Sequence, residues 1–190
     1  ATTWDDSGPP PHKTATTNVE GPRGHALCGP VAIRGAEPGM TLAITVEALR
    51  IGTWGWTVGG GYAPEEPNVM HLWDLNPDTL VGRNNHGHTV NLRPFLGVMG
   101  MPPAEPGKHS TQPPRLTGGN LDCKELVVGS TLYLPIAVAG GLFSTGDGHA
   151  VQGDGEVSRT AIECPMEDAA LTFHLLPDLH LTTPRAETPA

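Results

Sequence analysis

Apolar and polar side chains alternate with a period of two in residues 41–48 and 131–138. This spacing is typical of β-strands that bury one face, because successive side chains on a strand point to opposite sides. In the first segment the predicted buried face is Leu42, Ile44, Val46 and Ala48. In the second it is Leu132, Leu134, Ile136 and Val138. Pro135 lacks a backbone donor, which favours an edge or bulge position for the second strand.

Three further apolar segments, residues 92–101, 157–162 and 171–175, are also predicted strands. No window has a helical period longer than about two turns. Residues 52–68 are rich in Gly, Trp and Pro and are predicted to form a long loop. The pattern therefore predicts an all-β fold, a jelly-roll-like sandwich or a distorted barrel with long Gly/Pro-rich functional loops.

The composition is compatible with either a disordered chain or a turn-rich β fold. The chain has 190 residues, with 25 Gly, 20 Pro and 37% hydrophobic residues. Disorder would scatter the apolar residues, but here they cluster in short runs between Gly and Pro, which favours the β fold. Residues 1–23 are polar and Pro-rich without periodicity, and we expect them to form an irregular N-terminal arm.

Charge and cysteine content narrow the range of partners. The net charge is −9, with 11 Lys and Arg that form no cluster, so a nucleic-acid partner is not expected. No apolar stretch approaches the roughly 20 residues that span a bilayer, so no membrane partner is expected. The three cysteines lack a CxxC spacing, which argues against a disulfide framework or a zinc knuckle. A reduced, cytoplasmic protein is the simplest interpretation, although one disulfide among the three stays open.

The densest group of chemically active residues lies at 146–156. Asp147 and His149 are two positions apart, so an extended backbone points them the same way and lets them share one cation. Asp154 and Glu156 follow, among glycines that allow the chain to fold tightly around a small ligand. Imidazole with carboxylates suits zinc or another first-row ion, whereas oxygens alone suit calcium. The competing interpretation is a plain solvated turn.

Four weaker candidates lie elsewhere in the chain. Asn120 and Asp122 follow two glycines that would let them approach an ion, and His25 precedes a strand. His86 and His88 share the two-residue spacing of Asp147 and His149, but their polar neighbours indicate a surface loop. Cys123 precedes Lys124 and Glu125, and adjacent side chains on a strand cannot converge as a nucleophilic triad.

Several motifs together resemble the acetamidase/formamidase family. They are His25 with Gly29 to Val31, residues 35–39, 54–56, 94–100, 119–126, 129–135, 141–144 and 147–156. They follow the order of that family from about residue 24 to 176. The resemblance implies a β domain over residues 24–176, followed by a Pro-containing C-terminal tail at 177–190.

The resemblance also implies metal-dependent hydrolysis of formamide, acetamide or a γ-lactam to a carboxylate and ammonia or an amine. It implies an oligomeric enzyme, and family members are usually longer than this chain. We therefore expect either a homo-oligomer or a companion chain that supplies missing family regions. The alternative is a non-catalytic β-module or enzyme fragment whose acidic loop binds a structural metal ion.

Roles for individual residues follow as hypotheses. The expected ligands of a divalent ion, zinc or alternatively calcium, are Asp122, Asp147 and His149, with His25 as a fourth. Glu156 is the expected general base, and Asp154 is the second candidate for that role. The oxyanion is expected to be held by Asn120, Gln152 or loop amides.

Overall fold

The computed structural model describes residues 25–60, 65, 67–157 and 160–189. The predicted N-terminal arm at 1–23 lies outside these residues. The strands in chain order are β1 (Leu27–Val31), β2 (Thr41–Ile51), β3 (Trp54–Gly60), β4 (Asn68–Asn76), β5 (Val81–Asn84), β6 (Thr89–Asn91), β7 (Phe95–Gly100), β8 (Gly118–Asn120), β9 (Thr131–Pro135), β10 (Phe143–Gln152), β11 (Ala161–Glu163), β12 (Met166–Leu176) and β13 (Arg185–Glu187).

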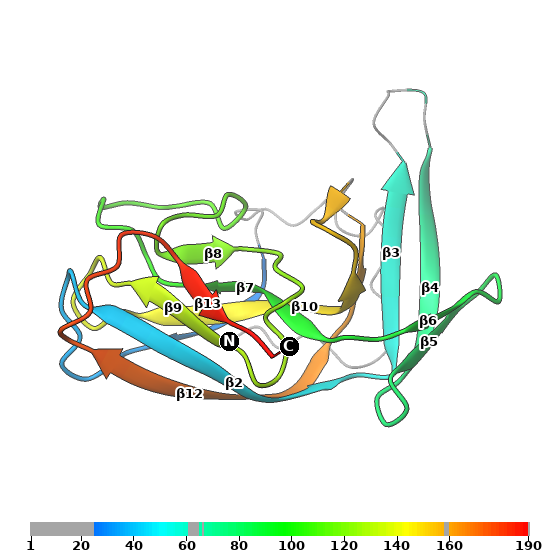
Figure 1. The fold of residues 1–190 in the computed structure, drawn as a ribbon. Helices are drawn as coiled ribbons and strands as arrows, with labels where there is room; N and C mark the ends of the chain where they lie inside the picture. Colours follow the sequence, from blue (N-terminus) through cyan, green and yellow to red (C-terminus); the bar gives the residue numbers. More distant parts are fainter. Residues whose placement is uncertain (1–24, 61–64, 66, 158–159, 190) are drawn as a thin grey trace.

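These strands form two antiparallel sheets (Figure 1). The larger has nine strands in the order β6-β5-β4-β3-β11-β10-β7-β8, with β1 paired to β10. The smaller has four strands in the order β12-β2-β9-β13. The all-β prediction is confirmed, and within the described residues both sheets stay open rather than closing into a barrel. None of the described residues forms a helix long and apolar enough to cross a membrane.

The main core lies between the two sheets. It joins Leu42 and Ile44 of β2 to Leu96, Met99 and Phe143 of the larger sheet. All six residues of β7 are buried, as expected for a strand covered on both faces. Because β7 and β10 pair side by side in this core, polar side chains on them are held in a rigid, largely dry setting.

The alternating pattern located β2 correctly but assigned one residue to the wrong environment. Leu42, Ile44 and Val46 are buried as predicted, whereas Ala48 is exposed. Ala43, on the opposite face of the strand, is buried as well. A sequence period identifies the alternating faces but not how far along the strand each face is covered.

The second predicted strand is shorter than expected. β9 ends at Pro135, and Val138 lies beyond it. Pro135 pairs only with Thr41 of β2, because the pairing with β13 stops at Tyr133. Pro135, which has no backbone N–H to donate, therefore lies where the strand has a neighbour on one side only. Residues 185–187, in the expected C-terminal tail, form β13 and extend this sheet.

The prediction of a long loop over residues 52–68 is wrong for a large part of that range. Residues 54–60 form β3, which pairs with β4 as a hairpin. The glycines that suggested a loop have a packing role here. A Cβ on Gly55 would lie 2.6 Å from the backbone oxygen of Glu163, so only glycine allows β11 to approach β3 this closely.

Candidate active site

Strand β10, an interior strand of the larger sheet between β7 and β11, carries two polar side chains of the site. Asp147 and His149 lie on this strand, and the loop after β8 brings Asp122 beside them. One possible ligand atom from each of the three lies within 4.8 Å of the others. The structure thus brings together three of the four ligands predicted from the sequence.

Both aspartates have a left-handed backbone. The φ angle is 45° at Asp122 and 60° at Asp147. Residues other than glycine rarely adopt this conformation, and it persists only where surrounding contacts enforce it. The amides of Leu121 and Asp122 both donate to the carbonyl of Gly97, at 2.9 and 3.2 Å, and this holds the loop against β7. Backbone strain at two converging carboxylates is typical of a functional site.

Gln152 fixes the tautomer of His149. The side-chain nitrogen of Gln152 donates to the backbone carbonyl of Asp122 at 2.8 Å, so its oxygen is the atom 3.0 Å from His149 Nδ1. An acceptor there places the proton on Nδ1, and the neutral ring then has a lone pair on Nε2. This assignment follows from the hydrogen-bond network. Gln152 thus holds the imidazole in place, and its role at the oxyanion stays a prediction.

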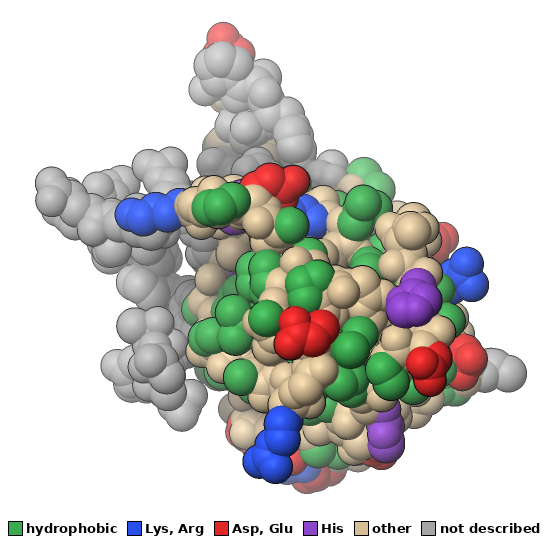
Figure 2. Space-filling view, turned by 90° about the vertical axis from the view of Figure 1, so that its left-hand side faces the viewer, with side chains coloured by type: hydrophobic (Ala, Val, Ile, Leu, Met, Phe, Trp, Pro, Cys, Tyr) green, Lys and Arg blue, Asp and Glu red, His purple; other side chains and the backbone are tan. Residues whose placement is uncertain are grey.

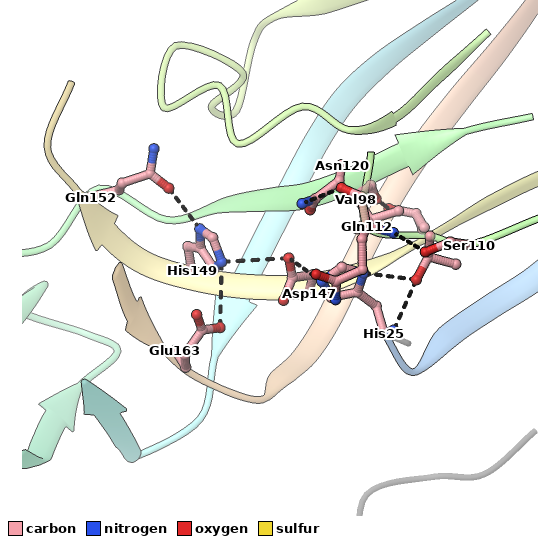
Figure 3. A network of polar contacts seen from close by, with 11 residues as sticks. His25, Val98, Ser110, Gln112, Asn120, Asp147, His149, Gln152 and Glu163 are labelled. Atoms are coloured by element: carbon pink, nitrogen blue, oxygen red, sulfur yellow. Dashed lines mark hydrogen bonds and ion pairs between the residues drawn. The ribbon is translucent and has the colours of Figure 1, made fainter. Parts of the chain in front are cut away.

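The Nε2 atom of His149 faces two carboxylates (Figure 3). Its Nε2 lies 3.3 Å from Glu163 Oε2 and 3.6 Å from Asp147 Oδ2. The His149 side chain is only 1% exposed. Among the described residues, His149 Nε2 and Asp122 Oδ1 are buried without a hydrogen-bond partner. Such atoms are costly to bury without a partner, and a positively charged species between them would supply one.

The pKa shifts of His149 and Asp122 also favour a positive charge at this position. Burial opposes charge on His149, but the carboxylates of Asp147 and Glu163 more than offset it and raise its pKa to about 11. Burial raises the pKa of Asp122, with the charge of His149 opposing and that of Asp147 adding. Either a proton or a metal ion can supply the missing positive charge. The mixed imidazole and carboxylate donors, with Nδ1 held by Gln152 so that Nε2 is the ring nitrogen left to bind, fit a divalent metal ion.

Glu156, the predicted base, lies beside His149 and Glu163. Glu156, Glu163 and His149 form a second group whose ligand atoms lie within 4.8 Å of one another. Burial and the charge of Glu163 raise the pKa of Glu156 to about 7, although His149 opposes the shift. A carboxyl group with this pKa can both accept and release a proton near neutral pH.

Gly97 leaves the space in which the carboxylates converge. It stands opposite the Asp147 position in the pairing of β7 with β10. A Cβ at Gly97 would lie 2.6 Å from Asp147 Oδ2 and 2.9 Å from Asp122 Oδ1. Any larger residue would therefore enter the site.

His25 lies at the edge of the cluster. Its Nε2 is 3.8 Å from Asp147 Oδ2, and its Nδ1 is 3.0 Å from the hydroxyl of Thr111. Figure 3 shows His25 on the far side of Asp147 from His149. The structure therefore places His25 next to one predicted ligand.

The remaining predicted residues lie further from the imidazole. The Asp154 side chain is 94% exposed and pairs with Lys124 at 2.5 Å. Asn120 donates from Nδ2 to the carbonyl of Gln112, while its Oδ1 is buried without a partner among the described residues. Burial raises the pKa of the Cys123 thiol, which disfavours the nucleophilic thiolate. All three cysteines are free thiols.

A cavity of about 350 Å³ adjoins the His25 side of the cluster. Apolar walls dominate it, including Leu27, Met101 and Leu142. Thr111 lines the cavity and also bonds to His25, which links the cavity to Asp147. A second cavity of about 320 Å³ touches Gln152, on the Nδ1 side of the imidazole.

Sequence reasoning missed Glu163 and Gly97. Glu163 is beside His149 because β11 pairs with β10 in a register that places these two residues opposite each other. No local motif marked it, since it follows an apolar run. Gly97 lies within an apolar strand, and its only signal was a glycine inside a buried segment, which often marks a close approach.

Comparisons with known proteins agree with the resemblance seen in the sequence. Residues 105–180 match the model of the acetamidase/formamidase family. An acetamidase of Mycolicibacterium smegmatis is 48% identical over 201 residues, an alignment that covers 70% of this chain and 49% of that protein. The chain spans about half the length of the curated relatives it matches.

Solved structures share the fold. An acetamidase of Yersinia enterocolitica superposes with a TM-score of 0.76 and 28% identity, over 86% of this chain and 53% of that one. A γ-lactamase of Delftia acidovorans has a TM-score of 0.71 at 20% identity, over 85% and 55% of the two chains. The second likeness concerns the fold alone. The family match, the relatives and the shared fold together show that the chain belongs to the acetamidase/formamidase family.

Proposed function

We propose that this chain carries out metal-dependent hydrolysis of the C–N bond of a small amide. The observation that carries the proposal is the buried Nε2 of His149, which the bond from Nδ1 to Gln152 orients toward Asp147 and Glu163. Family membership supports an amide as the substrate, because the relatives include proteins named formamidase and acetamidase. The products would be a carboxylate and ammonia or an amine.

The proposed metal ligands are Asp122, Asp147 and His149. Glu163 is the best placed further ligand, since its Oε2 lies 3.3 Å from His149 Nε2, and His25 is the next candidate. One imidazole with several carboxylates suits zinc or another first-row divalent ion, with calcium as the alternative. When bound, such an ion lowers the pKa of water towards about 7 and polarises an amide carbonyl.

Glu156 is the proposed general base. It would take the proton from the attacking water and pass it to the leaving nitrogen, which needs a carboxyl group that changes charge near neutral pH. Its pKa of about 7 suits that role. Asn120 is the proposed oxyanion donor, because Nδ2 has a second hydrogen besides the one given to Gln112.

The apolar cavity beside His25 is the proposed binding site for the acyl part of the substrate. Its volume of about 350 Å³ is ample for formamide or acetamide and also accommodates a γ-lactam ring. The substrate class therefore remains the three amides expected from the resemblance. Ammonia release from formamide and acetamide, and ring opening of a γ-lactam, would rank them.

The test uses His149→Ala with His174→Ala as its matched control. His174 is an exposed histidine on β12, in the other sheet. His149→Ala should lose the metal equivalent bound at this cluster and lose ammonia release, whereas His174→Ala should keep both. Circular dichroism would check that each variant is folded. Full metal content and turnover in folded His149→Ala would contradict the proposal.

A structural role for the metal is the second candidate. The observation that favours it is the position of His149, which is buried on an interior strand of the larger sheet, where an ion would stabilise the fold. In that case added metal raises the thermal unfolding midpoint, but no amide is hydrolysed. Ammonia release that depends on metal separates the two functions.

A further inference from the structure

A second group of histidines lies in the larger sheet, separated from β10 by β3 and β11. Strand β4 carries His71, and the turn from β5 to β6 carries His86 and His88. The amide of Asn85 donates to the carbonyl of Leu72 at 3.0 Å, which draws the turn against β4. The ring centroids of His71 and His86 are consequently 4.8 Å apart, with an interplanar angle of 66°.

The turn that carries His86 is held in place. The side-chain oxygen of Asn84 accepts hydrogen bonds from the amides of His86 and His88, at 3.0 and 2.9 Å. Gly87 has a φ of 85°, and its amide donates to the carbonyl of Asn84. Asn84 itself is only 8% exposed. The backbone beneath His86 is therefore fixed, which is the preorganisation that a ligand site needs.

His71 presents a nitrogen that needs a partner. Its Nδ1 is buried and has no hydrogen-bond partner in the part of the chain that the structure describes. Two imidazoles bound to one tetrahedral ion through bonds of about 2.0–2.1 Å keep their ring centroids about 5 Å apart. The His71 and His86 rings lie at nearly that spacing. A metal ion shared by the two rings would satisfy the buried nitrogen of His71.

We propose that His71 and His86 form a second metal site, which binds a first-row transition ion and is independent of the His149 cluster. Water molecules would complete its coordination. His88 borders the site without binding, since its Nδ1 is 3.2 Å from the side-chain nitrogen of Asn84 and its ring lies 6.5 Å from that of His86. A donor at Nδ1 leaves the proton of neutral His88 on Nε2.

The ligand chemistry sets the selectivity of this site. Two imidazoles without a carboxylate suit Cu²⁺, Ni²⁺ and Zn²⁺ and disfavour Ca²⁺ and Mg²⁺, which require oxygen. Cu²⁺ should bind most tightly of the three, following the usual order for nitrogen ligands. The His149 cluster, rich in carboxylates, lacks this strict preference.

Calorimetric titration of the metal-stripped chain with Ni²⁺ tests the site. Wild-type, His149→Ala and His174→Ala chains should each bind one equivalent that His71→Ala and His86→Ala lose. His86 is exposed, so His86→Ala should stay folded, and its unfolding midpoint without metal checks this. Equal Ni²⁺ stoichiometry and affinity in wild-type and folded His86→Ala chains would overturn the proposal. Loss of the same equivalent in His149→Ala would also overturn it, because the two sites would then not be independent.

Discussion

The Nε2 atom of His149 has two competing positive partners, a proton and a metal ion. Gln152 holds the ring so that Nε2 faces Asp147 and Glu163 in either case. Because a metal ion needs the unprotonated nitrogen, binding must release the proton that the carboxylates otherwise stabilise. Metal affinity should therefore rise with pH, and the metal-free chain should respond to pH in the opposite direction.

The metal-free chain should become less stable as the pH rises above neutrality. The pKa of His149 is about 11 in the folded chain, above its ordinary 6.5, so the folded state holds the proton more tightly. The resulting stabilisation is fully present below about pH 6.5 and is lost as the pH rises towards about 11. Thermal unfolding followed by circular dichroism, after chelation, measures it. His149→Ala should show a weaker dependence, and identical dependence in both chains would refute this effect.

Glu156→Gln should retain metal but lose turnover. The amide keeps the shape of the side chain and cannot accept a proton, so we expect kcat to fall by roughly 10²–10⁴-fold. The acidic limb of the wild-type pH profile, at or below about pH 7, should disappear with it. Asp154→Asn is the control, since Asp154 is exposed and paired with Lys124. If Asp154→Asn has the larger effect on kcat, the base has been misassigned.

At the scale of strands and turns, local sequence patterns predicted where strands lie but not which strands pair with each other. Alternation located β2 and β9, and the spacing of Asp147 and His149 identified one strand of the site. Glu163 was not predictable because its position depends on how β11 pairs with β10, which no local motif encodes. β3 was missed because glycine is conformationally costly in a strand, so Gly55 indicated a loop. The reason for a glycine there, the close approach of β11, is visible only in the structure.

Gly97→Ala tests the close approach of β7 to the carboxylates. The added methyl carbon would lie 2.6 Å from Asp147 Oδ2, so we expect metal content and turnover to fall together. Gly153→Ala is the matched control, because a Cβ there meets nothing within 4 Å. Elemental analysis and ammonia release measure the two effects. Wild-type metal content in Gly97→Ala would show that the carboxylates do not converge here.

At the scale of the whole molecule, the open sheets leave edges that the sequence pattern did not locate. β12 is 11 residues long and, among the described residues, pairs only with β2. Figure 2 shows hydrophobic side chains on the face that lies at the left of Figure 1, interrupted by acidic side chains and flanked by further charged and histidine side chains. Long open edges favour pairing with another chain, and apolar patches favour interfaces.

We expect the 190-residue chain to associate in solution, either with copies of itself or with a companion chain. Pairing along β12 would satisfy its free backbone groups and cover neighbouring apolar surface. Light scattering coupled to gel filtration measures the mass at micromolar concentration. A stable, folded monomer that persists across a concentration series would contradict this expectation.

The decisive measurement is ammonia release by the chain after chelation, with acetamide or formamide as substrate, while a divalent ion is added back. Turnover should be absent in the stripped chain and should return as the His149 cluster fills, at one ion per chain. His149→Ala should not recover at the same free metal concentration. Undiminished turnover in a stripped chain, with less than about a tenth of an equivalent of metal remaining, would contradict a metal-dependent amidohydrolase.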